Sequence, residues 1–572
     1  MGKKLLIALT VGLLASCDSG DIVISPSTAD NSTDSSVNNS NNTTTTPVVD
    51  DNPCASYEEG GETFEGSFDG LDCTYSVEFA AAGNSLTTDV TIPRLNLGGV
   101  NIFEGSLMVG TSYDTDADLA ANGITQGGDG PTLTVEAGAT VAFISPLDFL
   151  AVNRGSQIIA QGTQSRPITF TSLSDVQSAR AVANGLAATL DPEADTQWGG
   201  LVINGFGYTN KCASTGSIDG GDLAGSECHI DAEGSEGDKQ TSYGGFNNAD
   251  NSGILEYVVV KHTGGEVVPG DDLNGISFGG VGSGTTVNYL ETYSTFDDGI
   301  EMFGGAVNIS NFLGLYVKDD SIDIDEGYRG TITNALVIQS ETDGNHCIES
   351  DGIGSYDDVA LTPGAVDDIV ARGLNSRPVI RNLTCIISAV DGTRGDGAGW
   401  RMREGLFPIV EDSMVVTVGA DDAAANNYCV RVDNDEGLNE ITTSLGEADR
   451  SARLFDFNSV LFVCADRVRT VAEADVVALG AQFAQDAGLA AGLDPTAAAD
   501  TQLIVLEGSL ANSGFYSPDY DDVIIDDASG TAPAPVNGDH VGGVIQGAAG
   551  DWTLTWTYGL HAGNRGKPLW IP

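Results

Sequence analysis

A short pattern that returns along the chain constrains its fold more than any other feature. In each copy, an apolar residue, any residue and then Asn, Tyr or Asp stand directly before an apolar segment, as in Ile309-Ser310-Asn311 before Phe312. The copies at Asn311 and Asn334 are 23 residues apart, and the longer steps fit one repeat plus a loop insertion. The third position of the pattern is occupied by Tyr257, Tyr289, Asn311, Asn334, Asn382, Asp412 and Asn458.

A repeat of about 22 to 24 residues suits one coil of a parallel β-helix, in which three short strands complete a turn and coils stack at the strand spacing. Asn is expected at one corner because stacked Asn side chains can hydrogen-bond from coil to coil. Leucine-rich repeats have a similar length, but their Leu-x-x-Leu-x-Leu frame is missing from this sequence. The 74 glycines supply tight turns between short strands. We therefore predict an all-β fold, a right-handed parallel β-helix solenoid with loop insertions.

Several stretches of the sequence resemble a known family. They are Leu133 to Ser172, Trp198 to Gly205, Asn251 to Tyr257 and Phe278 to Thr285. The chain is similar there to β-helix surface lipoproteins of Gram-negative bacteria, well over residues 95–345 and loosely beyond. The resemblance implies a fold shared with pectate-lyase-like proteins and an accessory role beside an outer-membrane receptor. A shared fold does not by itself carry an activity.

Two segments interrupt the predicted solenoid. Residues 206–250 are rich in Gly and Asp and are interpreted as a long loop, and the Ala-rich segment 466–500 is predicted to add a short helical insertion. Trp552–Tyr558 alternates in polarity and is predicted to be a strand that closes the last coil, because solenoid ends need a cover. The expected boundaries are 53–92 for an N-terminal cap or small module, 93–465 for the β-helix, 466–500 for the helical insertion and 501–572 for the last coils and a cap.

The N-terminus carries an export signal. Two lysines precede a short apolar stretch, Leu5 to Leu14, which is too short to span a bilayer. Leu14-Ala15-Ser16-Cys17 resembles a lipobox, so residues 1–16 are predicted to be a lipoprotein signal peptide and Cys17 to be the lipidated residue that anchors the chain to a bilayer. Residues 17–52 are polar and are predicted to form a disordered tether. We expect a location at the outer membrane or cell surface, with the inner membrane as the alternative because Asp18 resembles a retention signal of enteric bacteria.

The remaining cysteines fit an exported protein. Eight are left after Cys17, and an even number outside the cytosol indicates disulfides. Neighbours along the chain are the simplest pairs, although eight cysteines allow 105 connectivities. No pair has CxxC spacing, which argues against a structural zinc site. The eight are Cys54, Cys73, Cys212, Cys228, Cys347, Cys385, Cys429 and Cys464.

The net charge of the chain limits the classes of molecule that it is expected to bind. The formal net charge is −58, from 82 acidic and 24 basic residues. Nucleic acid is excluded as an expected partner because phosphate needs a basic surface. An acidic surface suited to high salt, colloidal solubility or clustered carboxylates that hold Ca²⁺ would each explain such a charge.

Three acidic segments repeat with the period of the solenoid. They are residues 297–301, 319–326 and 343–351, and the second starts 22 residues after the first. Residues one period apart lie above one another in a β-helix. The predicted stacks are Asp298 with Asp320 and the Asn345–His346 region, and beside them Glu301 with Asp323 and Glu349.

Stacked carboxylates repel one another by about 1 kcal/mol or more unless something neutralises them. The first interpretation is a Ca²⁺ site, structural or binding, and the second is a solvated acidic ladder capped by Arg401, Arg403 and Arg431. The third is a catalytic cleft acting on a polysaccharide, with Asp298, Asp320, Asp323 and Arg401 as the reacting groups. His346 is interpreted as a packed residue. The predicted metal ligands are Asp298, Glu301, Asp320, Asp323, Asp325 and Glu349.

Two functions are therefore predicted. In the first, an exported lipoprotein presents an acidic β-helix that binds a cation, a glycan or an envelope protein. In the second, it is a β-helix polysaccharide lyase or glycoside hydrolase that acts at the acidic face. The sequence favours the first, because the lyase and hydrolase motifs of pectate-lyase-like enzymes do not map onto these positions.

Overall fold

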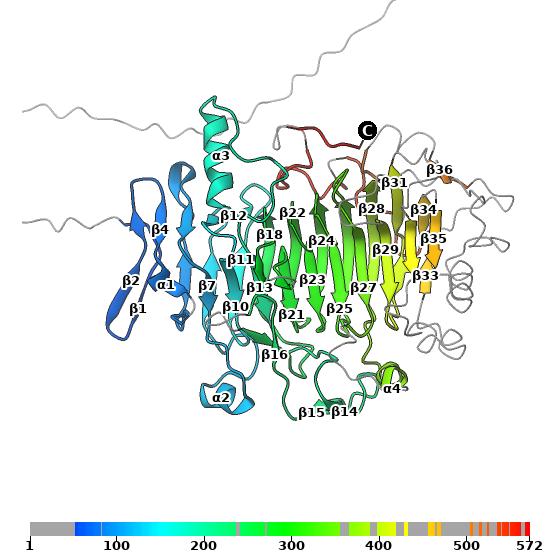
Figure 1. Ribbon diagram of the computed structural model, residues 1–572, viewed down its shortest axis with the longest axis horizontal. Coiled ribbons are helices and arrows are strands. Elements are labelled where there is room, and N and C mark those ends of the chain that lie inside the picture. The colour runs from blue at the N-terminus through cyan, green and yellow to red at the C-terminus, as the bar shows by residue number, and fades with distance from the viewer. Residues whose placement is uncertain are drawn as a thin grey trace, which may run out of the picture. The chain divides into compact units, whose positions relative to one another are not determined.

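Figure 1 shows the computed structural model of the chain. The structure describes residues 52–81, 83–235, 241–268, 271–354, 365–388, 397–418, 428–432, 456–463, 466–470, 504–506, 514–517, 523–525, 535–538, 540–547, 549–561 and 567–571. The predicted signal peptide, Cys17 and all but one residue of the predicted tether lie outside these ranges. No helix in the described ranges is long and apolar enough to cross a bilayer.

Parallel strands from successive coils form one sheet, here called sheet A, along one side of the solenoid. Each strand pairs in register with the strand one coil away, as Ile300 does with Ile322 and Ile322 with Ile348. Sheet A contains β7 (Leu107–Val109), β10 (Phe149–Val152), β13 (Gly200–Asn204), β21 (Ile276–Gly279), β23 (Ile300–Phe303), β25 (Ile322–Asp325), β27 (His346–Asp351), β29 (Ala398–Arg403), β32 (Tyr428–Val432) and β35 (Asp466–Thr470).

A second sheet, sheet B, supplies the other two arms of each coil. It is parallel except that β3 pairs antiparallel with β4. Its strands are β3 (Ser67–Phe68), β4 (Cys73–Tyr75), β5 (Val90–Ile92), β6 (Asn101–Phe103), β8 (Thr132–Val135), β9 (Thr140–Phe143), β11 (Gln157–Gln161), β12 (Ile168–Ser172), β18 (Gly253–Lys261), β22 (Thr286–Tyr293), β24 (Asn308–Leu315), β26 (Thr331–Ile338), β28 (Val379–Ser388), β30 (Ile409–Glu411), β31 (Met414–Val418), β33 (Asp456–Asn458) and β34 (Leu461–Val463).

The repeated Asn or Tyr lies at the bend, here called the corner, between the two segments of each coil that belong to sheet B. Asn311 has φ 54° and Asn334 has φ 56°, which is the left-handed region that Asn tolerates better than most residues. The Nδ2 atom of Asn334 donates to Oδ1 of Asn311 at 3.2 Å, and Asn311 donates to Asn288 at 2.8 Å. The predicted parallel β-helix with a corner Asn ladder is therefore confirmed. One position is wrong: Ser459, with φ 59°, occupies the last corner, and Asn458 pairs with Glu411 inside the arm.

Side chains that point inward from both sheets form one continuous apolar core. Ile276, Ile300, Ile322 and Ile348 stack along sheet A, and each is fully buried. Burying such a side chain stabilises the fold by roughly 1.5–3 kcal/mol. Because alternate residues point outward, the same strands must present their other residues on the outer face.

The solenoid begins earlier than predicted. Strand β4 pairs with β6 and β5 pairs with β8, so coils already form within residues 53–92, where a cap or small module was expected. Residues before these strands form a hairpin of β1 (Ser56–Glu59) and β2 (Glu62–Glu65). The helices within the described ranges are α1 (Val77–Ala80), the short 3-10 turn η1 (Asn96–Gly98), α2 (Asp116–Ala121), α3 (Leu173–Ala183) and α4 (Ala365–Ala371).

The C-terminal predictions need correction. Residues 466–470, expected in the helical insertion, form β35, which pairs with β32; the rest of that segment lies outside the described residues. Trp552–Tyr558 forms turns and closes no coil. It lies along the outer side of sheet B instead, where the ring of Trp556 contacts Tyr257 and Tyr289 edge-on. Strands β36 (Ile504–Leu506) and β37 (Val523–Ile525) form an antiparallel pair.

The long loop 206–250 is an insertion with short hairpins, and its predicted disulfide between Cys212 and Cys228 is present. Two more sequential pairs are confirmed, Cys54 with Cys73 and Cys347 with Cys385. Cys429 is also disulfide-bonded, and its expected partner Cys464 lies outside the described residues. The short strands are β14 (Ser214–Thr215), β15 (Ala224–Gly225), β16 (Ile230–Asp231) and β17 (Ser242–Tyr243), with β19 (Glu266–Val268) and β20 (Asp271–Asp272) nearby in sequence.

Candidate functional site

The outer face of sheet A carries the predicted acidic stack. Glu301 pairs in register with Asp323, and Asp323 pairs with Glu349, because their isoleucine neighbours point into the core. One coil further, Glu349 pairs with Arg401, which pairs with Arg431. The column therefore changes from acidic to basic along the solenoid, and the predicted stacking of distant carboxylates is confirmed.

The two arginines of β29 neutralise the last acidic residues. Nη1 of Arg401 lies 3.0 Å from Oε1 of Glu349. Arg403 forms ion pairs with both Glu349 and Asp351. Burial alone would raise the pKa of Glu349, but the hydrogen bond from His346 and the charges of Arg403 and Arg401 outweigh it and hold that pKa well below its usual range. Arg401, predicted as a reacting group for catalysis, is thus tied to a carboxylate.

Asp298 and Asp320 form a second column, at the turn before each strand. The backbone N–H of Asp320 donates to Oδ1 of Asp298 at 3.0 Å, and the N–H of His346 donates to Oδ1 of Asp320 at 2.7 Å. Asn274 begins this ladder by accepting from the N–H of Asp298 at 3.1 Å. Each side chain therefore holds the start of the next coil, a structural role that the sequence did not predict.

His346 lies among these carboxylates. Its Nδ1 atom is 2.7 Å from Oδ1 of Asp320 and 3.2 Å from Oε2 of Glu349. Burial lowers the pKa of this imidazole, and the side chain is 1% exposed. His346 is a packed residue, as predicted, and it orients two of the acidic side chains.

The carboxyl groups of this face are nearly removed from water. Asp298, Glu301 and Asp320 are 5–7% exposed. Burial is the largest cause that raises the pKa of each well above its usual range, and repulsion from neighbouring carboxylates raises it further. The same two causes raise the pKa of Asp323 and of Asp325.

The same causes act one coil further on. Burial raises the pKa of Asp351 to about 6 and that of Glu404 to about 10, with repulsion from neighbouring carboxylates adding to both shifts. Arg403 opposes the shift in both cases. Ionisation of all these carboxyl groups would therefore destabilise the folded chain. Bound protons or cations would remove this cost.

Within the described part of the chain, three sets of acidic or histidine side chains have possible metal-ligand atoms within 4.8 Å of one another. Asp298 belongs to two of them, one with Asp297 and Asp319 and one with Glu301 and Asp323. The third set contains His346. Five of the six predicted metal ligands fall in these sets; the exception is Asp325, whose Oδ1 accepts the backbone N–H of Glu326. The complete sets are Asp297, Asp298 and Asp319; Asp298, Glu301 and Asp323; and Asp320, His346 and Glu349.

Two residues of this site were missed by the sequence reasoning. Nδ2 of Asn274 donates to Oε2 of Glu301 at 2.6 Å and to Oε2 of Glu233 at 2.7 Å. Glu233 comes from the insertion, so a further carboxylate reaches the acidic face from outside the solenoid. The insertion is held there by Glu326, which accepts from Tyr243 and pairs with Lys211 at 2.6 Å.

Comparison with protein families agrees with this architecture. A sequence profile described as a pectate-lyase-like β-helix domain matches residues 107–447, more than half of the chain. The chain belongs to the pectate-lyase-like β-helix family. No curated protein and no solved structure gives a significant match. The matched region of this β-helix family begins at β7 and includes every strand that carries the acidic face.

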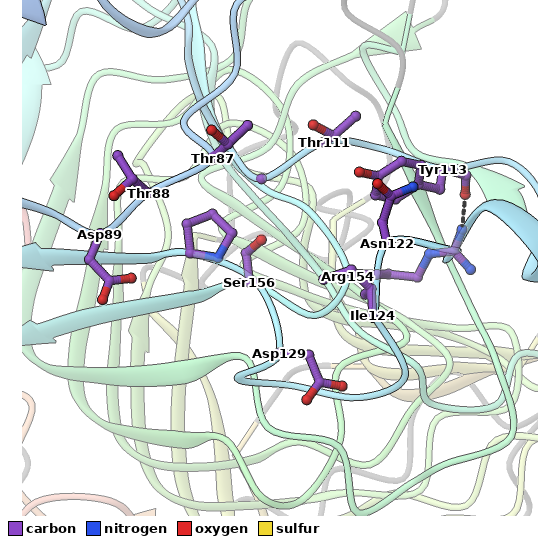
Figure 2. Close-up of a pocket in the computed structure, with 13 residues that line it drawn as sticks. Thr87, Thr88, Asp89, Thr111, Tyr113, Asn122, Ile124, Asp129, Arg154 and Ser156 are labelled. Atoms are coloured by element: carbon purple, nitrogen blue, oxygen red, sulfur yellow. Dashed lines mark hydrogen bonds between the residues drawn. The ribbon is translucent and has the colours of Figure 1, made fainter. Parts of the chain in front are cut away.

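A pocket of about 490 Å³ lies near the N-terminal end of the same β-helix domain, between loops of successive coils (Figure 2). Arg154 forms part of its wall but is 4% exposed, and its guanidinium donates to the carbonyls of Cys228, Gly244 and Tyr113. Arg154 therefore fastens the insertion to the solenoid. Most of the other side chains in the lining are polar, and these include Thr87, Thr88, Asp89, Thr111, Asn122, Asp129 and Ser156.

Proposed function

We propose that this β-helix protein is an exported, lipid-anchored binding scaffold whose acidic face holds divalent cations, with Ca²⁺ as the expected ion. The observation that supports this most is the burial of Asp298 and Glu301 within reach of each other and of the half-buried Asp323. None of these three carboxylates forms an ion pair with a described side chain, whereas Glu349 and Asp351 pair with Arg401 and Arg403. An ion in their midst would remove both the repulsion and the desolvation cost of the ionised groups.

The donor chemistry favours a hard cation. Ca²⁺ binds six to eight oxygen atoms and tolerates irregular geometry, whereas Mg²⁺ demands a compact octahedron. The two sets that contain Asp298 supply only carboxylate oxygen, and Glu233 lies near Glu301 because both accept from Nδ2 of Asn274. The set with His346 is less suitable, because its Glu349 already pairs with Arg401 and Arg403.

The cation proposal is tested by equilibrium dialysis of the purified protein against Ca²⁺ after EDTA treatment. We expect bound Ca²⁺ and an at least tenfold weaker affinity in Asp323→Asn, which removes one charge and keeps the side-chain shape. Asp114→Asn is the matched control, since Asp114 is an exposed aspartate outside sheet A. If the parent protein binds no Ca²⁺ at millimolar concentration, the proposal is wrong.

The membrane anchor is proposed from the lipobox that ends at Cys17. Cys17→Ser should move the protein from the membrane fraction to the soluble fraction of the producing cell, while a mutation in the tether, such as Ser19→Ala, should not. A Cys17→Ser protein that stays in the membrane fraction would contradict the lipid anchor. The outer membrane or cell surface is the proposed location, and sucrose-gradient fractionation separates it from the inner membrane.

A glycan is the proposed partner class for this scaffold, with an envelope protein as the other candidate. The pocket near the N-terminal coils offers hydroxyl, amide and carboxylate groups suited to sugar hydroxyls. Cleavage of a polysaccharide is the second candidate function, favoured by the pectate-lyase-like family and by carboxyl groups with raised pKa values. Turnover of any polysaccharide that is abolished by Asp323→Asn would replace the scaffold proposal with an enzyme.

A further inference from the structure

A second group of buried charged side chains lies on the opposite side of the solenoid, on the outer face of sheet B. Lys261 ends β18, and its Nζ atom is 2.7 Å from Oδ2 of Asp175 in the first turn of α3. The two side chains are only 8% and 12% exposed. The ring of Tyr558, from the C-terminal segment, lies 3.9 Å from Nζ and covers the pair.

A carboxyl group without a charged partner at hydrogen-bond distance accompanies this pair. Glu291, on the neighbouring strand β22, is fully buried and points to the same face as Lys261. Its Oε2 atom accepts the backbone N–H of Tyr558 at 2.8 Å, and its Oε1 atom has no hydrogen-bond partner among the residues that the structure describes. Burial raises the pKa of Glu291 well above its usual range, which favours the protonated form of this group. Tyr558 thus contacts both Glu291 and Lys261.

His262 completes the group. Its Nδ1 atom is 2.5 Å from the carbonyl oxygen of Ala194 and must donate there, because a carbonyl only accepts. Its Nε2 atom then faces Oδ1 of Asp175 at 3.4 Å. The site therefore holds an amine, two carboxyl groups and an imidazole, with protons to exchange and almost no access to water.

Burial would raise the pKa of Asp175, but Lys261 and His262 outweigh it and hold that pKa well below its usual range, so the ion pair depends on these partners. Each buried ion loses several kcal/mol of solvation, and the mutual attraction of the pair repays this only with good additional hydrogen bonds. Thr171 supplies one to Asp175, at 2.8 Å. Condensation of the amine with the carboxyl group would remove both charges at once. We infer that Lys261 and Asp175 are joined by an intramolecular amide bond, and that Glu291 moves the protons of the reaction.

The step balances without any co-reactant. The ammonium group of Lys261 first passes a proton to the carboxylate of Asp175. The free amine then attacks Cγ of Asp175, an Nζ–Cγ bond forms, and the Cγ–Oδ1 bond breaks. Glu291 gives its proton to the departing oxygen and takes one from Nζ on its other oxygen, so that it ends protonated again. One water molecule leaves, and no atom is oxidised or reduced.

The geometry suits this reaction. Reacting atoms that lie roughly 3–3.5 Å apart form a near-attack arrangement, and Cγ is bonded to the oxygen that Nζ already contacts. Holding the groups together supplies an effective concentration of about 10⁵ M or more, which outweighs the tendency of water to reverse the bond. The product would connect α3 covalently to β18. The bond would thereby hold α3, which lies outside the coils, against the central part of the solenoid.

Peptide mapping of the full chain tests this inference. After reduction and digestion with trypsin, we expect a branched peptide in which Lys261 is uncleaved and linked to the peptide that contains Asp175, lighter by one water than the sum of its parts. Fragment spectra place the link and separate it from cyclised Asp-Gly sites, which lose water without branching. Lys211 is an internal control: it also pairs with a buried carboxylate, but both oxygens of Glu326 are hydrogen-bonded, and we expect cleavage there.

Glu291→Gln keeps the size of the side chain and should abolish the branched peptide while the protein remains folded by circular dichroism. Lys261→Arg preserves the charge and should behave in the same way. A parent protein in which trypsin cleaves after Lys261, with no branched peptide, overturns the inference. A branched peptide that persists in Glu291→Gln would overturn the role given to Glu291.

Discussion

At the scale of single residues, some carboxyl groups of the acidic face accept backbone hydrogen bonds and also lie close to other carboxyl groups. Asp298 and Asp320 accept the backbone N–H groups of the next coil, so they are needed for the fold. Burial, together with the like charges around them, raises the pKa of both carboxyl groups. Asparagine could accept the same hydrogen bond without a charge, so these hydrogen bonds alone do not require aspartate at the two positions.

The raised pKa values predict an unusual pH dependence of stability for the cation-free protein. A carboxyl group whose pKa is raised by folding binds its proton more tightly in the folded chain, so its contribution is lost as pH rises through the folded-state pKa. Unfolded carboxyl groups titrate near pH 4, and folded Asp351 titrates at about 6. In EDTA we therefore expect a higher melting temperature near pH 5 than near pH 7.5.

Addition of Ca²⁺ should raise the melting temperature more at about pH 7.5 than at about pH 5, because protons and the cation compete for the same oxygens. Asp323→Asn should show a smaller difference between the two pH values than the parent protein. An EDTA-treated protein that is more stable at pH 7.5, with no dependence on Asp323, would contradict this prediction.

Much of this face could be predicted because it follows the period of the repeat. Glu301, Asp323 and Glu349 occupy equivalent positions in successive coils, and the register places them together. Glu233 could not be found in this way, because it lies in the insertion, whose path depends on non-periodic contacts such as those of Arg154 and Glu326. The backbone hydrogen bonds of Asp298 were missed because they depend on the turn conformation before each strand.

At the scale of secondary-structure elements, the corner of each coil determines where an arm of sheet B ends and the next begins. Six of the seven predicted corner positions have positive φ, from Tyr257 to Asp412. The seventh corner lies one residue later than predicted. Asp456, Phe457 and Asn458 still pair with β30 of the neighbouring coil, and Ser459 forms the turn. The spacing of the pattern predicts the period of the repeat well. It does not predict the exact corner residue where the usual apolar residue is replaced by a polar one, as at Asp456.

The corner ladder can be tested at Asn311. Asn311→Ala removes hydrogen bonds worth about 0.5–1.5 kcal/mol and places alanine in the left-handed region at a cost of about 1–2 kcal/mol. We expect a loss of about 2 kcal/mol in the free energy of unfolding, measured by urea denaturation. Asn311→Gly loses the hydrogen bonds but tolerates the backbone, so it should be less destabilising; equal losses would mean that backbone conformation does not matter at this corner.

The C-terminal segment was predicted as a capping strand because its alternating aromatic residues suit an exposed sheet edge. In the structure, Trp556 packs instead against Tyr257 and Tyr289, far back along the chain. A sequence pattern shows that aromatic residues need burial, but it does not show which surface will bury them. Here the surface is the outer side of sheet B, where Leu313, Leu336 and Ile386 form an apolar strip.

Trp556→Ala should release this segment. The indole is 2% exposed, and truncation of such a side chain typically costs about 3–5 kcal/mol. We expect limited proteolysis to cut between Gly542 and the C-terminus in the variant at protease concentrations that leave the parent intact. Trp552→Ala, at a half-buried indole in the same segment, is the matched control and should have a weaker effect. Equal resistance in all three proteins would show that Trp556 does not hold the segment.

At the scale of the whole described solenoid, stability is shared between stacked coils and covalent links. Each coil contacts mainly its neighbours, so the energy of the fold is close to a sum of coil and interface terms. A net charge of −58 adds repulsion that weakens a chain of this size in low salt. Disulfides offset this by constraining the unfolded chain, and their effect depends on whether they connect coils or lie within an insertion.

The disulfides therefore predict two different responses to cysteine removal. Cys347 and Cys385 are fully buried, connect β27 to β28 and close a loop of 38 residues, so replacing both by alanine should lower the free energy of global unfolding by about 2–4 kcal/mol. Replacing Cys212 and Cys228 should instead expose the insertion 206–250 to protease at an almost unchanged melting temperature, because that disulfide lies wholly within the insertion. Calorimetry and limited proteolysis on both double variants separate these responses. Since the insertion brings Glu233 to the acidic face, the second variant should also bind Ca²⁺ more weakly; unchanged Ca²⁺ affinity would mean that the insertion does not contribute to the cation site.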